Sequence, residues 1–216
     1  MNKYPALFIL ISFLLILNSC IGISMDIQMN KDGSGKIVME YRVSQMLQNI
    51  GAFDGNESMP SVPISREDWR KTVDSISGFK LASYSSKKDK QDTIVNVTLE
   101  FKEEEALLAF LSPIGEKVTI KRTGASGTLE IILLDEPVPL NEEDINLSKM
   151  LMDGYKFSIG FKAPGNSVLA ITDGSGNSSP APASSEAVLS GKNVMFSIAM
   201  ADLFELKNGL GLRFIW

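Results

Sequence analysis

The size and composition of the chain favour a folded, mildly acidic protein and exclude two functional classes. Its 216 residues are 44% hydrophobic and 22% charged, which is typical of a globular chain and is enough to bury a sizeable core in one domain. The formal net charge of -5 leaves no clustered basic face, so no nucleic-acid partner is expected. The sequence has no histidine, which excludes Ser-His and Cys-His nucleophiles and histidine metal sites.

The first twenty residues are typical of a bacterial lipoprotein leader. Lys3 precedes an almost wholly apolar stretch from Ala6 to Leu17, and a small residue stands directly before Cys20, the only cysteine in the chain. We predict that residues 1–19 are a signal peptide, that Cys20 is the lipid attachment site, and that residues 20–23 form a lipidated tether. Diacylglycerol on the sulfur and a palmitate-type chain on the new amino terminus would hold the protein at a membrane, because one acyl chain alone holds a protein only marginally.

Two alternative interpretations of this leader stay open. Asn18 is not the usual small or β-branched residue at its place in a lipoprotein motif, so the signal peptide could be cut elsewhere, with Cys20 incidental. The other alternative is an uncleaved membrane anchor. The apolar stretch is short for that role, since spanning a bilayer takes about 20 residues, although Ile21 to Ile23 would extend it.

A β-hairpin is predicted directly after the leader. Met25, Ile27 and Met29 alternate with polar residues, the stretch 30–35 is polar and glycine-rich, and the alternation resumes from Ile37 to Tyr41. The turn also has oxygen-bearing residues at the first, third and fifth places of an EF-hand-like loop. The twelfth place is Tyr41, where calcium needs a bidentate glutamate, so we favour the hairpin and expect no metal site.

Five stretches have helical patterns. The clearest begins at Ser65, which forms a capping-box signature with Asp68, and Trp69 and Val73 then fall on one helical face. The other four helices are expected from Ser44 to Ile50, from Glu103 to Leu111, from Asn141 to Leu151, and, as a short helix, from Met200 to Lys207. Glu103, Glu104 and Glu105 could be offered as catalytic acids, but acidic residues in a first helical turn are favoured by the helix dipole whatever the function.

The remaining periodic stretches predict strands, with a second hairpin whose turn is Lys87 to Lys90. Further strands are expected at 79–83, 94–101, 117–122, 128–134, 155–162, 167–172, 193–199 and 210–216. Residues 173–186 are rich in Gly, Ser and Pro and are predicted to be a flexible loop. The fold class is therefore predicted to be α+β, a mostly antiparallel sheet built from hairpins with several short amphipathic helices packed on one face. Residues 24–216 would form a single ectodomain.

The sequence carries no residue pattern that predicts catalysis. Ser77 with Lys80 and Ser85 with Lys88 have the spacing of a serine-lysine nucleophile pair, yet neither position is expected to bury its lysine and so lower the lysine pKa. With the only thiol assigned to lipid attachment, no cysteine chemistry remains. We expect a protein that is not an enzyme, with no cofactor.

The order of these features resembles LppM-type bacterial lipoproteins. It combines the lipobox-like leader, the turn Asn-Lys-Asp-Gly-Ser-Gly at 30–35, the Trp-containing helix, the strand that ends at Phe101, and the closing Gly-Leu-Arg-Phe-Ile-Trp at 211–216. Such proteins often carry a C-terminal membrane helix, which this sequence lacks. The resemblance implies an α+β ectodomain at the cell envelope that engages lipid or glycolipid, and it transfers no catalytic residue.

Two functional hypotheses follow. The first is a membrane-anchored envelope lipoprotein, held outside the cytoplasm, whose folded body has a non-enzymatic structural or protein-interaction role. The alternative is a lipid or glycolipid binding module with a hydrophobic cavity. The membrane, an envelope protein and a lipid are the partners expected under these hypotheses. A closed core favours the first, and an open apolar cavity favours the second.

Overall fold

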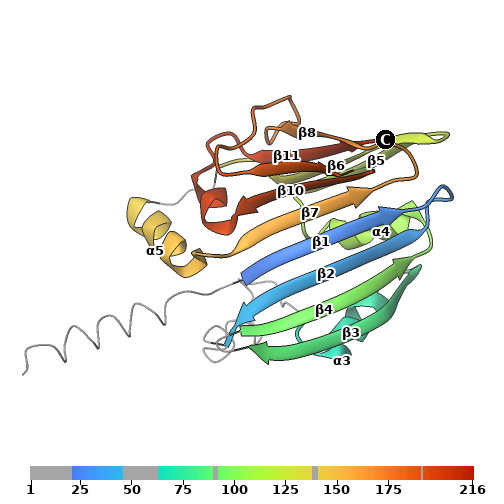
Figure 1. Cartoon of the computed structure of the whole chain (residues 1–216), viewed down its shortest axis with the longest axis horizontal. Helices are drawn as coiled ribbons and strands as arrows, with labels where there is room; N and C mark the ends of the chain where they lie inside the picture. Colours follow the sequence, from blue (N-terminus) through green and yellow to red (C-terminus); the bar gives the residue numbers. More distant parts are fainter. Residues whose placement is uncertain (1–20, 46–62, 90–91, 138–140, 191) are drawn as a thin grey trace, which may run out of the picture.

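The computed structural model describes residues 21–45, 63–89, 92–137, 141–190 and 192–216, which form two β-sheets, three α-helices and one 3-10 helix. The large sheet has seven strands in the order β3-β4-β2-β1-β7-β10-β9, and the small sheet has four in the order β5-β6-β11-β8. Figure 1 shows the small sheet lying against the part of the large sheet that contains β7 and β10. The prediction of α and β elements is confirmed, but the chain builds two sheets rather than one.

The large sheet is formed by β1 (Ile21–Met29), β2 (Gly35–Ser44), β3 (Phe79–Asp89), β4 (Asp92–Phe101), β7 (Lys156–Lys162), β9 (Glu186–Ser190) and β10 (Asn193–Ala199). The small sheet is formed by β5 (Lys117–Thr123), β6 (Ser126–Leu134), β8 (Val168–Thr172) and β11 (Leu210–Ile215). The predicted hairpins are present as β1-β2, β3-β4 and β5-β6, all antiparallel. The large sheet also contains a parallel pair, β1 with β7, so it is mostly but not wholly antiparallel.

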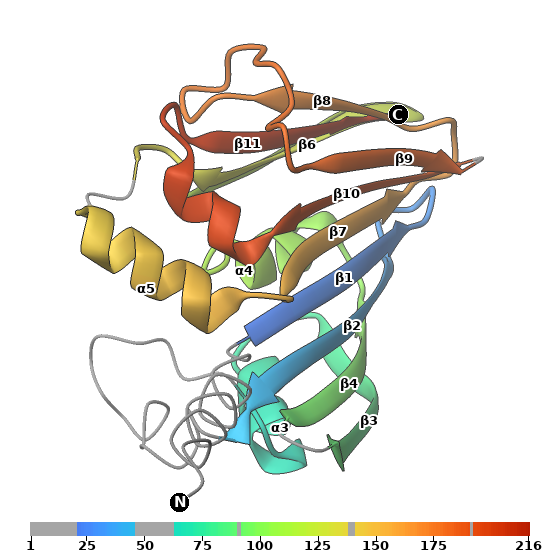
Figure 2. The same cartoon turned by 60° about the vertical axis from the view of Figure 1, so that its left-hand side comes forward.

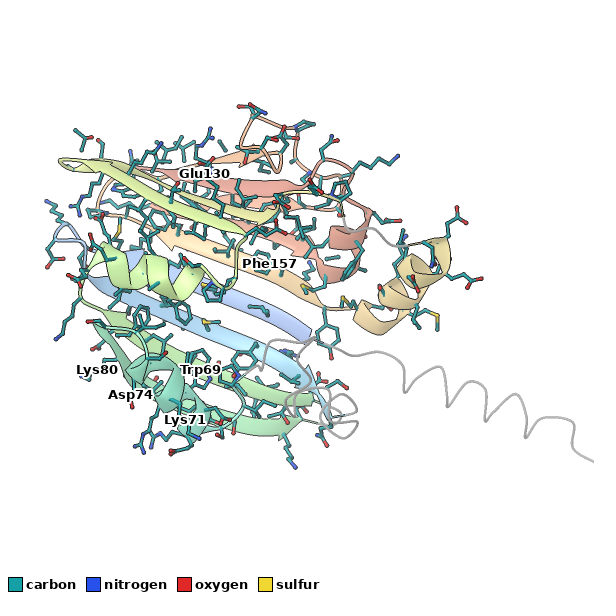
Figure 3. All side chains as sticks on the ribbon, turned by 180° about the vertical axis from the view of Figure 1, so that it is seen from behind. Trp69, Lys71, Asp74, Lys80, Glu130 and Phe157 are labelled. Carbon is teal, nitrogen blue, oxygen red and sulfur yellow. The ribbon has the colours of Figure 1, made fainter. Side chains whose placement is uncertain are left out.

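One face of the large sheet, called the inner face here, carries the core. Alternate residues of β1 and β2, including Met25, Ile27 and Ile37, are almost fully buried on this face. Helices α3 (Arg66–Asp74) and α4 (Glu104–Leu111) cover it beside β3, β4 and β2, and the small sheet covers it beside β7 and β10, as Figure 3 shows from behind, with Trp69 on α3 and Phe157 on β7. Burial of alternating apolar positions is the main stabilising term for such a layered fold.

Aromatic side chains join the layers. The ring of Phe161 on β7 lies 5.3 Å from that of Phe214 on β11 and 5.1 Å from that of Trp216, measured between centroids. Under the helices, the ring of Phe110 on α4 lies 6.5 Å from that of Trp69 and 5.1 Å from that of Phe79. One continuous cluster of buried side chains therefore includes both sheets and both helices.

The third helix does not pack on the sheet face. Helix α5 (Glu142–Met152) packs against η1 (Met200–Glu205) at one end of the molecule, where Lys149 and Glu205 form a 2.6 Å ion pair. Figures 1 and 2 show α5 beyond the ends of β1 and β7 rather than over the inner face. The prediction that all the helices pack on one face is therefore not confirmed, because the small sheet occupies the part of that face that a third helix would need.

Several element boundaries also differ from the prediction. Lys87, Lys88 and Asp89 belong to β3 and not to a turn, since they continue the pairing of β3 with β4. Strand β9 was not predicted, because its sequence directly follows the Gly-, Ser- and Pro-rich stretch that indicated a loop. Strands β7 and β8 follow each other along the chain, yet they belong to different sheets. The helix predicted from Ser44 to Ile50 falls mostly outside the described residues, and Ser44 itself ends β2.

Candidate functional site

The predicted lipid attachment site stands directly before a residue that is paired in the large sheet. Cys20 lies outside the described residues, but the next residue, Ile21, already pairs with Val43 as the first residue of β1. Consecutive Cα atoms are about 3.8 Å apart. The prediction of a tether at 20–23 is therefore wrong for its last three residues, because the main chain of Ile21 to Ile23 is held in the sheet by pairing with β2.

The tip of the β3-β4 hairpin lies at the same end of the large sheet as Ile21. The strand registers place Ile21 opposite Val43, Val43 opposite Thr93, and Thr93 opposite Lys88. Lys88 therefore lies in the same transverse row as the first residue of β1, three strands away, or about 14 Å at the usual strand spacing. Lys87 and Lys88 are both exposed, so the lysine-rich segment extends into solvent at this end of the sheet. We call this end of the molecule the Ile21 end.

Helix α5 flanks the Ile21 end on its other side. Only three residues separate the end of α5 from the start of β7, and Phe157 of β7 pairs with Ile23 of β1. The helix exposes two large apolar side chains, Leu147 at 53% and Met150 at 47% of their full accessible surface. Asn141 caps the helix by accepting a hydrogen bond from the main-chain N–H of Asp144 at 2.9 Å, as the sequence predicted.

A groove of 520 Å³ opens on the outer face of the large sheet at the Ile21 end. Its floor includes Gly22, over which the ring of Tyr155 lies; a Cβ at Gly22 would stand 2.9 Å from a carbon of that ring. The Tyr155 hydroxyl donates a 2.9 Å hydrogen bond to Asp92, and Arg42 lies 3.5 Å from Glu40. The groove therefore offers both cationic and anionic groups, which can hydrogen-bond polar or zwitterionic molecules but include no activated nucleophile.

The residues for which a catalytic role was considered, the serine-lysine pairs and the glutamate run, are exposed to solvent or form ion pairs. Lys80 is 73% exposed in its side chain and lies 3.7 Å from Glu100, so its ammonium is not buried as a serine-lysine nucleophile would need. Ser85 and Lys88 are exposed on β3. Glu104, from the glutamate run, forms a 2.6 Å ion pair with Arg122 that joins α4 to β5.

The turn that invited a calcium interpretation is held by its own hydrogen bonds. Asp32 accepts hydrogen bonds from the hydroxyl of Ser34 at 2.7 Å and from its main-chain N–H at 3.1 Å, and Asn30 donates to the same hydroxyl at 3.0 Å. These bonds to Ser34 lower the pKa of Asp32. Across the part of the chain that the structure describes, no group of three or more acidic or cysteine side chains gathers as a metal site would require.

Large apolar side chains lie between the layers, and Phe161, Phe196, Phe214 and Leu129 are fully buried there. A second hollow of 470 Å³ lies at the other end of the large sheet, and charged residues such as Lys36, Lys80 and Glu100 line it together with Phe101. The two hollows described here are thus open at the surface and combine charged side chains with apolar surface.

One buried polar network was missed by the sequence reasoning. The hydroxyl of Tyr41 on β2 donates to the carbonyl of Pro63 and accepts a 2.9 Å hydrogen bond from the indole of Trp69, and the hydroxyl of Tyr84 donates to the carbonyl of Ile64 at 2.6 Å. Burial raises the pKa of Tyr41, which keeps its hydroxyl protonated. This network attaches the segment before α3 to the sheet and has no sequence signal, because each bonded pair is twenty or more residues apart.

Comparisons with known proteins identify one similar fold. No protein-family model matches the sequence, and no curated protein matches it. The NMR structure of the folded domain of LppM from Mycobacterium tuberculosis is similar to this chain with a TM-score of 0.47 and 7% sequence identity, over 91% of this chain and 90% of that domain. At this level of likeness neither family membership nor any residue's role passes from one chain to the other.

The described helices are also too short or too polar for a membrane span. Among the residues that the structure describes, none of the helices combines the length and the hydropathy that crossing a bilayer requires.

Proposed function

We propose that this chain is a lipoprotein held by acylated Cys20 at a membrane of a bacterial cell envelope, outside the cytoplasm, and that its folded body has a non-enzymatic structural or protein-interaction role. The observation that carries the proposal is Cys20 itself, the only cysteine of the chain, which follows a lysine and a long apolar stretch and has a small residue directly before it. The residue after it, Ile21, pairs with Val43 in the large sheet. Cleavage before Cys20 would therefore leave this pairing intact.

The non-enzymatic part of the proposal is supported by the surroundings of the polar side chains. The lysines and glutamates that sequence spacing could have placed in a catalytic site are solvated or paired with a partner that serves the fold. The charged side chains that line both surface hollows favour an interaction body over the alternative, a lipid binding module with a hydrophobic cavity. The envelope partner would be a protein or the lipid surface itself.

The anchor is tested by replacing the sulfur. In a bacterial host that processes lipoproteins, the full chain should fractionate with membranes, and its mass should show loss of residues 1–19 and gain of acyl groups. Cys20→Ser should move the protein out of the membrane fraction or leave it with an unmodified mass, because serine cannot take the thioether-linked diacylglycerol. Ser19→Ala, which keeps a small residue beside the cysteine, serves as the matched control and should behave as the natural sequence does.

Other outcomes of this experiment separate the alternatives. A natural chain that fractionates with membranes but keeps residues 1–19 and gains no acyl group would point to an uncleaved anchor. A protein whose mass and fractionation are both unchanged by the substitution would overturn the lipoprotein proposal.

A further inference from the structure

We propose that α5 lies in the head-group region of the membrane that holds Cys20, with Leu147 and Met150 inserted among the acyl chains, so that the helix fixes the orientation of the body. The inference rests on the proposed lipid anchor at Cys20. It adds a second membrane contact, made by the folded part of the chain.

The first step is that no flexible linker separates Cys20 from the large sheet. Because Ile21 is already paired in the sheet, the end of the large sheet lies within about 4 Å of the Cα of the acylated residue. A body on a long tether could take any orientation, but this body must place the Ile21 end at the membrane surface. The elements that flank that end are then the ones that meet lipid.

The second step is the position of α5. The main chain of Lys156 lies close to Gly22, directly before the pairing of Phe157 with Ile23 in the parallel β1-β7 register. Met152, the last residue of α5, precedes Lys156 by four residues. Since four extended residues span at most about 14 Å and neighbouring strands lie about 5 Å apart, the end of α5 lies within about 20 Å of Gly22. Figure 2 shows α5 beside the starts of β1 and β7.

The third step is the distribution of polarity along α5. Its acidic residues, Glu142, Glu143 and Asp144, are all in the first turn, which the helix dipole favours. Leu147 and Met150 follow in the half of the helix that leads to β7, and both are about half exposed. An exposed apolar edge next to an anchor is the arrangement of an interfacial helix, which gains free energy when that edge leaves water.

The exposed lysines of β3, on the other side of the Ile21 end, also favour contact with a lipid bilayer. Lys87 and Lys88 are exposed in the transverse row of the anchor or next to it, where long cationic side chains can reach anionic head groups. Asp89 is exposed beside them, so this contact is weaker than a purely basic cluster would give. Because the anchor already holds the protein at the surface, small contacts on either side act at a high effective concentration.

The test uses the chain's single cysteine. With Cys20 acylated, a cysteine introduced at Leu147 or Met150 is the only free thiol and takes a nitroxide label. Val168→Cys is the matched control, because Val168 is 56% exposed but pairs with Ile215 near the C-terminus, at the opposite end of the molecule. The full acylated chain is reconstituted in vesicles of phosphatidylethanolamine and phosphatidylglycerol at 3:1, and collisions with oxygen and with an aqueous nickel chelate are measured.

We expect nickel collisions at Leu147→Cys and Met150→Cys to be at least about threefold rarer than at Val168→Cys, with oxygen collisions more frequent, as for a side chain inserted below the head groups. Equal nickel collisions at all three positions, in protein that floats with the vesicles, would overturn the inference and leave the anchor intact. Protein that does not float would overturn the proposed function instead. The same low nickel collision rate at positions 147 and 150 in a Cys20→Ser protein without vesicles would mean that the protein itself shields the label. That result would also overturn the inference.

Discussion

At the scale of single residues, the start of α3 is the clearest case in which local chemistry determines structure. The sequence predicted a capping box, and the structure has it: Asp68 donates its main-chain N–H to the hydroxyl of Ser65 at 3.1 Å, and its carboxylate accepts from the Ser65 main chain at 3.0 Å and from the hydroxyl at 2.6 Å. These bonds to Ser65 lower the pKa of Asp68 from its ordinary 3.8. A box of this kind is readable because its partners are three residues apart.

Substitution of the capping serine should change both stability and titration. For Ser65→Ala we expect a loss of about 1 kcal/mol in the free energy of unfolding and a rise of the Asp68 pKa toward its ordinary value. Because the folded pKa is depressed, the contribution of Asp68 is present above the ordinary pKa and is lost as the pH falls through the folded pKa. The stability difference between the natural chain and the variant should therefore shrink below about pH 4.

The measurements are denaturant unfolding at several pH values and a carboxyl-carbon NMR titration. Ser75→Ala is the control, because its hydroxyl donates to the carbonyl of Thr72 at the other end of α3, at 2.7 Å. That variant should leave the Asp68 titration unchanged. An Asp68 pKa that is the same with and without the Ser65 hydroxyl would contradict the assigned cause.

Other single residues could not be assigned from the sequence, because their constraint comes from distant partners. Nothing near Gly22 in the chain indicates that the ring of Tyr155 lies over it, and Tyr41 and Trp69 meet across 28 positions. The same is true at the candidate site. The sequence predicted Cys20 as the lipid attachment site, but only the registers of β1, β2, β4 and β3 bring Lys88 into the row of Ile21.

At the scale of elements, hairpins were predictable and long-range pairings were not. β1-β2 and β5-β6 follow from alternation on both sides of a short polar turn. The parallel pairing of β1 with β7 and the separation of β7 from β8 depend on layers formed far along the chain. Strand β9 was missed for a related reason, since it is an edge strand of five exposed residues and has no buried alternation to reveal it.

Two half-buried arginines attach loops to the sheets in the same way. Arg122 on β5 binds the carboxylate of Glu104 at 2.6 Å and also donates to the carbonyl of Lys31. Arg213 on β11 binds the carboxylate of Glu130 at 2.6 Å and donates to the carbonyl of Gly176 at 2.7 Å. The bond from Arg213 to Gly176 holds the first part of the stretch 173–186, which was predicted to be a flexible loop. Each arginine uses its planar fork to reach acceptors on separate segments at once, a geometry that the single ammonium of lysine does not reproduce.

Replacement of Arg213 by lysine should free that loop selectively. Arg213→Lys keeps the charge near Glu130 but loses the bond to Gly176, so we expect faster amide exchange at residues 174–178 with little change elsewhere. Arg122→Lys is the matched control and should affect exchange near Lys31 instead. Hydrogen exchange followed by mass spectrometry distinguishes the two. Unchanged exchange in the 174–178 segment of the Arg213 variant would show that Asp173, which accepts from the main chains of Ser175 and Asn177 at 2.9 Å, suffices to hold it.

At the scale of the whole molecule, the two sheets and the inner-face helices share one core. The sequence predicted most of the strands, including β4 and β7, yet it could not show that they form two stacked sheets. Alternation indicates which side of a strand faces the core, but it does not indicate which strand or sheet lies against that side. Phe161 illustrates this point. Its place on the inner face was readable from period two, but its contacts with Phe214 and Trp216, from the last strand of the chain, were not.

Because Phe161 joins the sheets, its truncation should weaken both of them together. For Phe161→Ala we expect a loss of about 3–5 kcal/mol in the free energy of unfolding, from lost burial and the cavity left behind, which a domain of ordinary stability can survive. Val168→Ala, on an exposed position of β8, is the control and should be close to neutral. In the Phe161 variant, native-state hydrogen exchange should show slow amides of β2 and of β6 losing protection by the same amount. Loss of protection confined to β6 would mean that the small sheet opens independently. The protein would then unfold as two cooperative units instead of one.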